Sequence, residues 1–209
     1  DHHALPEVLP AADALIHPLL PDAEATPLCG AGIAWKLACA LLGEKAAAKS
    51  LDLAALATIA DLVPLTGENR VLTALGLSAL GKTRRPGLQA LMRAAGIKEG
   101  APVSAEQVAF QLAPRLNAGG RLSTASDALQ LLVTPGPVEA EQLAQRLDAL
   151  NRERRGVETR VLREASVQLQ GADLSQVRSI VVAGEGWNPG VVGLVAGKLA
   201  ERWNYPVLA

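Results

Sequence analysis

The sequence predicts an α/β protein that is mostly helical and ends in a short parallel sheet. Apolar residues recur about every four positions through several segments, which is the spacing of helices with one buried face. Near the C-terminus, the β-branched run 179–183, the turn 184–190, the helix 191–203 and the run 205–209 form a strand–turn–helix–strand unit. Such units are usually parallel and right-handed. Because 49% of the 209 residues are hydrophobic, the chain can bury a substantial core.

Caps, glycines and prolines predict where the helices begin and end. Ser104 and Gln107 form a capping box, and Pro114 requires the helix that they begin to end before it. Residues 12–16 form a short apolar run that predicts a buried strand. Helices are predicted at 30–42, 51–60, 69–80, 87–95, from 104 to before 114, and at 137–169.

Composition argues against some functional classes. The formal charge of −1 does not favour a broad nucleic-acid-binding surface, and 2% aromatic residues leave few platforms for stacked bases. No apolar run has membrane-spanning length, so a cytoplasmic protein is expected. Cys29 and Cys39 are too few for a disulfide framework and are expected to be small core side chains. Because the first residue is Asp rather than Met, we expect a piece of a longer protein.

Asp1, His2 and His3 are candidates for a catalytic metal site, and Asp61 is a further candidate. The first three residues place a carboxylate beside two imidazoles, and a solvated histidine pair is the alternative. Asp61 is expected at the C-terminus of a helix, where a negative charge opposes the helix dipole. A bound metal ion and an ordinary salt bridge would both compensate that charge.

Three glycine-containing stretches are candidate phosphate sites. Arg115, Asn117 and Arg121 surround two glycines in a stretch predicted to be irregular, and guanidinium groups suit phosphate oxygens. The alternative is that these arginines bind neighbouring carbonyl groups. The helix start at 190–193 would present free N–H groups to a phosphate. The stretch 30–32 is either a similar cradle or a place of close helix packing.

Five stretches together resemble the DHH phosphoesterase superfamily and, within it, the RecJ family of bacterial single-strand-specific exonucleases. The resemblance lies in their order, spacing and residues, and Asn151-Arg-Glu-Arg154 adds to it. The five stretches are Asp1-His2-His3, 28–37, 57–65 followed by 68–70, 114–122, and 186–193.

The resemblance implies a fold, a reaction and a cofactor. Residues 1–136 would be the C-terminal, mostly helical part of a parallel-sheet DHH domain, 137–171 a long linker helix, and 172–209 the truncated start of a DHHA1-type α/β domain. The reaction would be metal-dependent removal of nucleotides from the 5′ end of single-stranded DNA, in DNA repair and recombination. Two divalent ions, Mn²⁺ or Mg²⁺, would activate the water.

The resemblance also implies residue roles. His2 and Asp61 would bind metal, Asp1 would ligate or orient, and His3 would contact the scissile phosphate or assist proton movement. Where the family usually has His, this chain has Asn188, which cannot carry a proton. The residues expected at substrate phosphates are His3, Arg115, Asn117, Arg121, Gly186, Asn188, Gly190 and Gly193.

The expected partner is single-stranded DNA, with a single-strand-binding protein and a helicase as further candidates, no membrane, and a monomeric state. Two alternatives stay open: a phosphoesterase acting on short oligonucleotides, cyclic dinucleotides or pyrophosphate, and a non-catalytic nucleic-acid-binding relative. Because the family's aspartate motifs upstream of the histidines lie outside the sequence, we expect these 209 residues alone to lack substantial nuclease activity.

Overall fold

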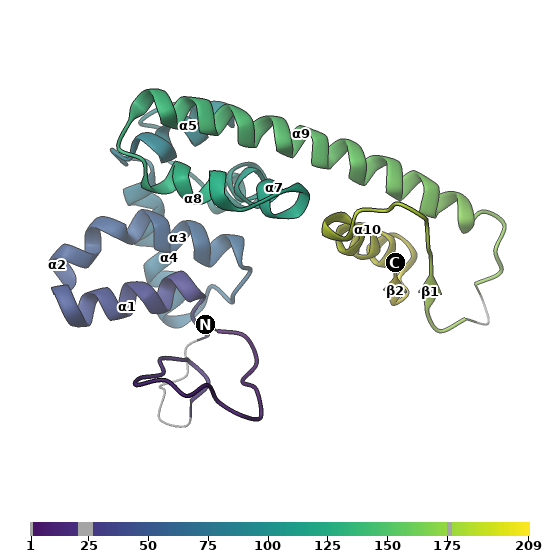
Figure 1. Cartoon of the computed structure of the whole chain (residues 1–209), viewed down its shortest axis with the longest axis horizontal. Coiled ribbons are helices and arrows are strands. Elements are labelled where there is room, and N and C mark those ends of the chain that lie inside the picture. Colours follow the sequence, from purple (N-terminus) through teal and green to yellow (C-terminus); the bar gives the residue numbers. More distant parts are fainter. Residues whose placement is uncertain (1, 21–26, 175–176) are drawn as a thin grey trace. The chain divides into compact units, whose positions relative to one another are not determined.

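The computed structural model describes residues 2–20, 27–174 and 177–209, and the chain forms two compact units (Figure 1). Unit 1 is Asp1–Ala113 and unit 2 is Pro114–Ala209. The described part of the chain is mostly helical, with one small parallel sheet, which confirms the predicted fold class at this coarser level. The finer division into catalytic, linker and second domains stays a prediction.

Unit 1 is built from helices. Helices α3 and α4 pack closely against each other. A Cβ at Gly76 on α4 would lie 2.3 Å from the Leu51 carbonyl oxygen and from the Ala55 Cβ, both on α3. Glycine therefore permits this contact, although it costs helix propensity. The elements are α1 (Gly30–Leu42), α2 (Glu44–Ala47), the 3-10 turn η1 (Ala48–Ser50), α3 (Leu51–Ala60), α4 (Gly67–Leu80), α5 (Pro86–Ala94), α6 (Ala105–Gln107) and the π-helical turn η2 (Val108–Leu112).

The strand predicted at 12–16 is wrong. The described residues 2–20 contain no helix or strand, and Ile16 is 50% exposed rather than buried. A strand must satisfy its backbone N–H and C=O groups by pairing. The two strands that the structure describes pair with each other in unit 2, so residues 12–16 have no strand partner among them.

Two predictions around Pro114 are also wrong. The helix that begins at the Ser104 capping box, which the structure confirms, does not end before Pro114. It continues through η2 into α7 (Ala113–Leu122), so the stretch 115–121 is helical rather than irregular. Proline lacks an N–H and clashes with the carbonyl four residues earlier in a regular helix. The wider π-helical turn directly before Pro114 changes that local hydrogen-bond pattern, as such turns do at helix irregularities.

Unit 2 contains the long helix and the sheet. The strand–turn–helix–strand prediction is confirmed, with shorter strands: Ile180 pairs with Val207 and Val181 with Leu208 in parallel. The remaining elements are α8 (Ser126–Val133), α9 (Pro137–Gln168), β1 (Ile180–Val181), α10 (Pro189–Trp203) and β2 (Val207–Leu208).

A separate hydrophobic core holds the last part of unit 2 together. It joins the second half of α9 to β1 and α10, so the helix and the sheet are fixed to each other by apolar burial. Within the described part of the chain, none of the helices has the length and apolarity required to cross a membrane. The core residues are Val161, Ala165, Leu169, Ile180, Val182, Val191, Val195 and Leu199.

Candidate functional site

The structure brings His2 and Asp61 together although they are far apart in the sequence. The His2 Nε2 and Asp61 Oδ2 atoms are 2.8 Å apart, with side chains 21% and 43% exposed. The exposed His3 ring lies beside the His2 ring, with centroids 4.5 Å apart and planes tilted by 40°. Asp1, the third predicted metal ligand, lies outside the described residues. The described part of the predicted metal site is therefore one paired imidazole and carboxylate at the surface.

A sharp turn at the end of α3 positions the Asp61 side chain. Asp61 is the C-cap of α3, and its N–H donates to the Ala57 carbonyl at 2.9 Å. Leu62 follows in the left-handed region, with φ at 56°, and is 84% exposed. The side chain of His2 lies against the carboxylate, where a hydrogen bond from the ring would compensate Asp61 at the negative end of the helix dipole.

The chemistry and spacing of this pair fit a divalent ion. An imidazole nitrogen and a carboxylate oxygen are ligands that Mn²⁺ accepts. Neighbouring ligands of an octahedral ion with bonds of about 2.1 Å lie roughly 3 Å apart, which is close to the 2.8 Å observed between Nε2 and Oδ2. Residues 2–20, 27–174 and 177–209 contain no group of three or more His, Cys, Asp or Glu side chains suited to a metal. The pair thus fits two positions of a coordination shell.

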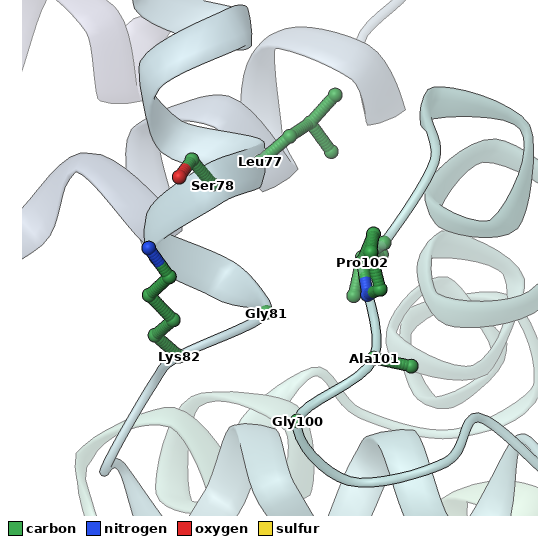
Figure 2. Close-up of a pocket in the computed structure, with 8 residues that line it drawn as sticks. Leu77, Ser78, Gly81, Lys82, Gly100, Ala101 and Pro102 are labelled. Atoms are coloured by element: carbon green, nitrogen blue, oxygen red, sulfur yellow. The ribbon is translucent and has the colours of Figure 1, made fainter.

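Two of the hollows among the described residues of unit 1 differ in their distance from Asp61. One of about 300 Å³ is lined mainly by apolar residues next to Asp61, including Ile59, Leu62 and Val63. The other, of about 250 Å³, lies between the C-terminal end of α4 and the segment 100–103 (Figure 2). Because α4 begins shortly after Asp61 and runs for 14 residues, this second hollow is about 20 Å along the helix from the Asp61 turn. Of these two hollows, only the first is lined by sequence neighbours of Asp61, and neither is lined by His2 or Asp61 itself.

Helix α7 places the predicted phosphate-binding residues on different faces. Each residue of an α-helix turns by about 100°, so Asn117 and Arg121 share a face while Arg115 is turned about 120° from Arg121. Arg115 Nε donates to Asp148 Oδ1 on α9 at 2.9 Å, and its side chain is 17% exposed. Arg115 thus binds a carboxylate within the chain, and not the neighbouring carbonyl group that the alternative named. Its phosphate-binding role stays a prediction.

The α7 stretch and the stretch at the start of α10, both predicted to bind phosphates, meet at Arg121 and Gly190. Arg121 Nη1 donates to the Gly190 carbonyl at 3.0 Å. A Cβ at Gly190 would lie 2.1 Å from the Arg121 carbonyl oxygen, closer than atoms can approach. The C-terminal end of α7 and the first turn of α10 therefore touch through backbone atoms. The sequence predicted both segments at phosphates, and the structure adds that they are neighbours.

Asn188 caps α10. Its Oδ1 accepts from the Gly190 N–H at 2.8 Å, and its carbonyl accepts from the N–H groups of Val191 and Val192. Asparagine is a favourable N-cap because its side-chain oxygen satisfies an otherwise unbonded N–H. The Gly190 N–H is thus bonded inside the chain. Gly186 has φ at 72°, a value that glycine adopts without strain, and Gly193 is exposed.

Close packing explains one glycine of the 30–32 stretch. A Cβ at Gly32 would lie 3.3 Å from the Leu28 side chain, and the Gly32 N–H donates to the Cys29 sulfur at 3.4 Å. Cys29 is 1% exposed and is the N-cap of α1. Its burial confirms the prediction of a small core side chain, and the capped N–H favours packing over an anion cradle.

Comparison with known proteins identifies the relatives of the chain. No family model matches it. It is 46% identical over 210 residues to the single-stranded-DNA-specific exonuclease RecJ of Bacillus subtilis, covering all of this chain and 26% of that protein. The crystal structure of Thermus thermophilus RecJ in complex with Mn²⁺ superposes with a TM-score of 0.87 and 38% identity, over 99% of this chain and 31% of that one. This chain is a RecJ homologue.

The match covers only part of each RecJ protein. The chain spans about a quarter of the Bacillus subtilis RecJ and 40% of the Escherichia coli RecJ, to which it is 36% identical. The complex of Thermus thermophilus RecJ with Mg²⁺ also matches, with a TM-score of 0.75 and 36% identity, over 91% of this chain and 29% of that one. RecJ structures therefore contain both of the metal ions that the resemblance implied.

The RecJ-like motif 151–154 belongs to a polar network between α9 and α10. Arg154 donates to Asn151 Oδ1 at 3.3 and 3.2 Å and pairs with Glu158 at 2.5 Å, and Lys198 on α10 also pairs with Glu158. Burial of Glu158 acts to raise its pKa, but the hydrogen bond and charge of Lys198 and the charge of Arg154 together lower it below its usual value. The carboxylate therefore stays ionised and joins the two helices.

Sequence reasoning gave no role to two residues that the RecJ-like structure makes important. Asp148 lies on the long helix and pairs with Arg115 across 33 positions, and local sequence patterns carry no signal for such a pair. Asn69 lies inside the RecJ-like stretch 68–70 and is completely buried. No local signal marks it, because Glu68 and Arg70 beside it in the first turn of α4 are polar as well.

Proposed function

We propose that the chain is part of a metal-dependent exonuclease that removes nucleotides from the 5′ end of single-stranded DNA by phosphodiester hydrolysis, in DNA repair and recombination. The observation that carries this proposal is the His2–Asp61 pair, whose atoms 2.8 Å apart suit one divalent ion. It is supported by homology to proteins named single-stranded-DNA-specific exonuclease, at 36–46% identity for those of Escherichia coli and Bacillus subtilis.

In this proposal His2, Asp61 and Asp1 hold two divalent ions, Mn²⁺ or Mg²⁺, together with residues outside the sequence. The bound ions would supply Lewis acidity at a phosphoryl oxygen and lower the pKa of bound water. The His2 Nε2 and Asp61 Oδ2 atoms face each other, so one ion could take both as ligands in place of their direct contact. The exposed His3 ring beside His2 can donate to a phosphate oxygen. His3 then holds the scissile phosphate or moves a proton.

The α7–α10 junction would bind substrate phosphates further along the strand. Asn117 is exposed on the same face of α7 as Arg121, so both can face one ligand. Asn188 keeps its Nδ2 hydrogens as donors, because its Oδ1 caps the helix. Arg115 would need to leave Asp148 to bind a phosphate directly. Gly186, Gly190 and Gly193 let the backbone approach the ligand.

The remaining predictions form part of the same proposal. Residues 1–136 would belong to a DHH catalytic domain, 137–171 would be the linker helix, and 172–209 would begin a DHHA1-type domain. The partners would be single-stranded DNA, a single-strand-binding protein and a helicase, and the protein would act as a cytoplasmic monomer.

The test uses the full-length protein and single-stranded DNA labelled at either the 5′ or the 3′ end. We expect Mn²⁺- or Mg²⁺-dependent release of mononucleotides from the 5′ end, abolished by EDTA. Faster turnover of dinucleotides, cyclic dinucleotides or pyrophosphate than of the strand would contradict the exonuclease assignment and favour a small-substrate phosphoesterase. Binding of the strand without any cleavage would favour a non-catalytic relative.

A companion experiment concerns residues 1–209 alone. Because the chain spans 26–40% of the RecJ proteins of Bacillus subtilis and Escherichia coli, we expect it to degrade 5′-ended single strands far more slowly than the full-length protein. Metal-dependent degradation by the purified 209-residue chain at the full-length rate would overturn this expectation.

A further inference from the structure

One buried amide holds the loop that carries Asp61. Asn69 lies in the first turn of α4 and is 0% exposed. Its Nδ2 donates to the Pro64 carbonyl at 3.1 Å and to the Pro27 carbonyl at 3.0 Å. A single side chain thus ties together two segments that are far apart in the sequence.

The first of these bonds closes the Asp61 loop. At its start, the Asp61 N–H donates to Ala57 at the end of α3. Leu62 then takes a left-handed conformation, which an L side chain rarely adopts and which persists only where surrounding contacts hold it. At its end, the Pro64 carbonyl is held by Asn69. The path of the backbone around Asp61 is therefore fixed at both ends.

The second bond fixes the same loop against the start of α1. Pro27 lies just before α1, so Asn69 links the beginning of α1 to the loop between α3 and α4. Two further contacts join these helices: Lys36 Nζ to Glu68 Oε1 at 2.7 Å, and Cys29 Sγ to Thr58 Oγ1 at 3.5 Å. Asn69 is the member of this set that bonds directly to the Asp61 loop.

We infer that Asn69 is a positioning residue for the Asp61 carboxylate in metal binding. This inference rests on the proposed function, because it takes Asp61 as a metal ligand. Asn69 itself touches neither metal nor substrate. It acts by holding the Pro64 carbonyl, and through it the turn that aims Asp61 at His2.

The role requires two donors at one atom, which an amide nitrogen supplies. Asn69→Asp keeps the shape of the side chain but removes the donors to the Pro27 and Pro64 carbonyl groups. A carboxylate oxygen would face the two carbonyl oxygens instead, and these contacts are repulsive. Thr73, one turn later on α4, is the matched control: it is 5% exposed, and among the described residues its Oγ1 has no hydrogen-bond partner. Thr73→Val therefore changes a buried polar group on the same helix without removing a bond to the loop.

The experiment measures Mn²⁺ binding to the full-length protein by isothermal titration calorimetry at pH 7.5, together with thermal stability. For Asn69→Asp and Asn69→Ala we expect Mn²⁺ affinity to fall by about 10- to 100-fold, the range typical when a group that orients a metal ligand is removed. Thr73→Val is expected to bind Mn²⁺ as the wild type does. A role in stability alone would lower the melting temperature and leave the dissociation constant of the folded protein unchanged.

Each outcome separates the two claims. If the wild type binds Mn²⁺ and both Asn69 variants bind it equally well, the positioning role is overturned and the proposed function stands. If the wild type itself binds no Mn²⁺, the metal assignment of the proposed function fails, and the positioning role fails with it. An equal loss of affinity in Thr73→Val would also overturn the specific role of Asn69.

A measurement on the wild type covers the case in which both Asn69 variants fail to fold. With ¹⁵N-labelled asparagine, the Asn69 side-chain amide signal is expected to exchange slowly with solvent and to shift when Mg²⁺ is titrated. An Asn69 signal that does not respond to Mg²⁺, while Mg²⁺ binding is detected by calorimetry, would overturn the inference.

Discussion

The two regions that carry the candidate functional residues differ in how their polar groups are used. In unit 1, the His2–Asp61 pair is at the surface, and Asp61 is 43% exposed. In unit 2, Arg121 and Asn188 are bonded to the backbone at the start of α10, and Arg115 is bonded to Asp148. A ligand can join the first region by contacting exposed atoms, whereas a phosphate in the second must compete with contacts inside the chain.

This difference predicts where a substitution acts. Groups such as Asp61, which are exposed and held by a turn, can be altered with little loss of packing. Groups at the α7–α10 junction, such as Gly190, also maintain the structure of unit 2, because backbone atoms meet there. We therefore expect changes at the His2–Asp61 pair to affect activity more than stability, and changes at the junction to affect stability first.

The largest expected effect is that of Asp61→Asn. Losing one metal-binding oxygen removes several kcal/mol of transition-state stabilisation, which corresponds to a loss of about a thousandfold in the rate of single-strand degradation by the full-length protein. Because Asp61 is 43% exposed, the free energy of unfolding should change by less than about 1 kcal/mol. Asp13→Asn, at an exposed position, is the control. A variant at Asp61 with the wild-type rate would remove the metal assignment.

Gly190→Ala should affect stability most. The added Cβ would lie 2.1 Å from the Arg121 carbonyl oxygen, so α7 and α10 must separate locally. Overpacking of this kind costs about 1–3 kcal/mol. Gly193→Ala is a matched control in the same helix, because no heavy atom lies within 4 Å of a Cβ there; it should stabilise α10 by up to about 1 kcal/mol. Amide hydrogen exchange in α10 would detect both changes, and equal exchange in the two variants would contradict the close contact.

Local patterns predicted the elements well where caps and periodicity agree. The helices α1, α3 and α9 begin and end within a few residues of the predicted positions, and the parallel pairing of the last two strands is confirmed. At Pro114 the local rule failed, because a π-helical turn before the proline let the helix continue. At 12–16 an apolar run was not a strand, because strand formation depends on a neighbouring strand that no local pattern reveals.

The candidate site shows the same limit. The conflict of Asp61 with the helix dipole left a metal ion and a salt bridge open, and its role as a metal ligand was implied by the family resemblance. The structure places His2 against it. The bonds of Asn69 to Pro27 and Pro64, and of Arg115 to Asp148, join residues through the tertiary fold. The helical conformation of α7 also separates Arg115 from Asn117 and Arg121, which the sequence had placed in one loop.

The ion pair between α9 and α10 predicts a pH dependence confined to unit 2. The pKa of the Glu158 carboxyl is lower in the folded protein than in the unfolded chain. Its ionised form therefore stabilises the fold fully above the usual glutamate pKa of about 4.3. This stabilisation is lost as the pH falls through the lower pKa of the folded protein. Glu158→Gln should therefore cost about 1.5 kcal/mol at pH 7 and progressively less below pH of about 4. Urea titration followed by tryptophan fluorescence would measure this, with the exposed Glu153→Gln as control. A cost that is independent of pH would show that the charge of Glu158 is not responsible.

The smallest effect should come from Leu62→Gly, and its sign is the informative part. Leu62 has φ at 56° and is 84% exposed, so glycine would relieve left-handed strain with little loss of packing. After the greater entropy of glycine in the unfolded chain is subtracted, we expect a gain of about 0.5 kcal/mol in the free energy of unfolding. Leu75→Gly, at a 56% exposed position inside α4, should instead cost about 1 kcal/mol. Equal destabilisation of the full-length protein by both substitutions in urea titrations would show that the Asp61 turn is not strained. The His2–Asp61 pair in unit 1 would then depend on packing as much as the α7–α10 junction in unit 2 does.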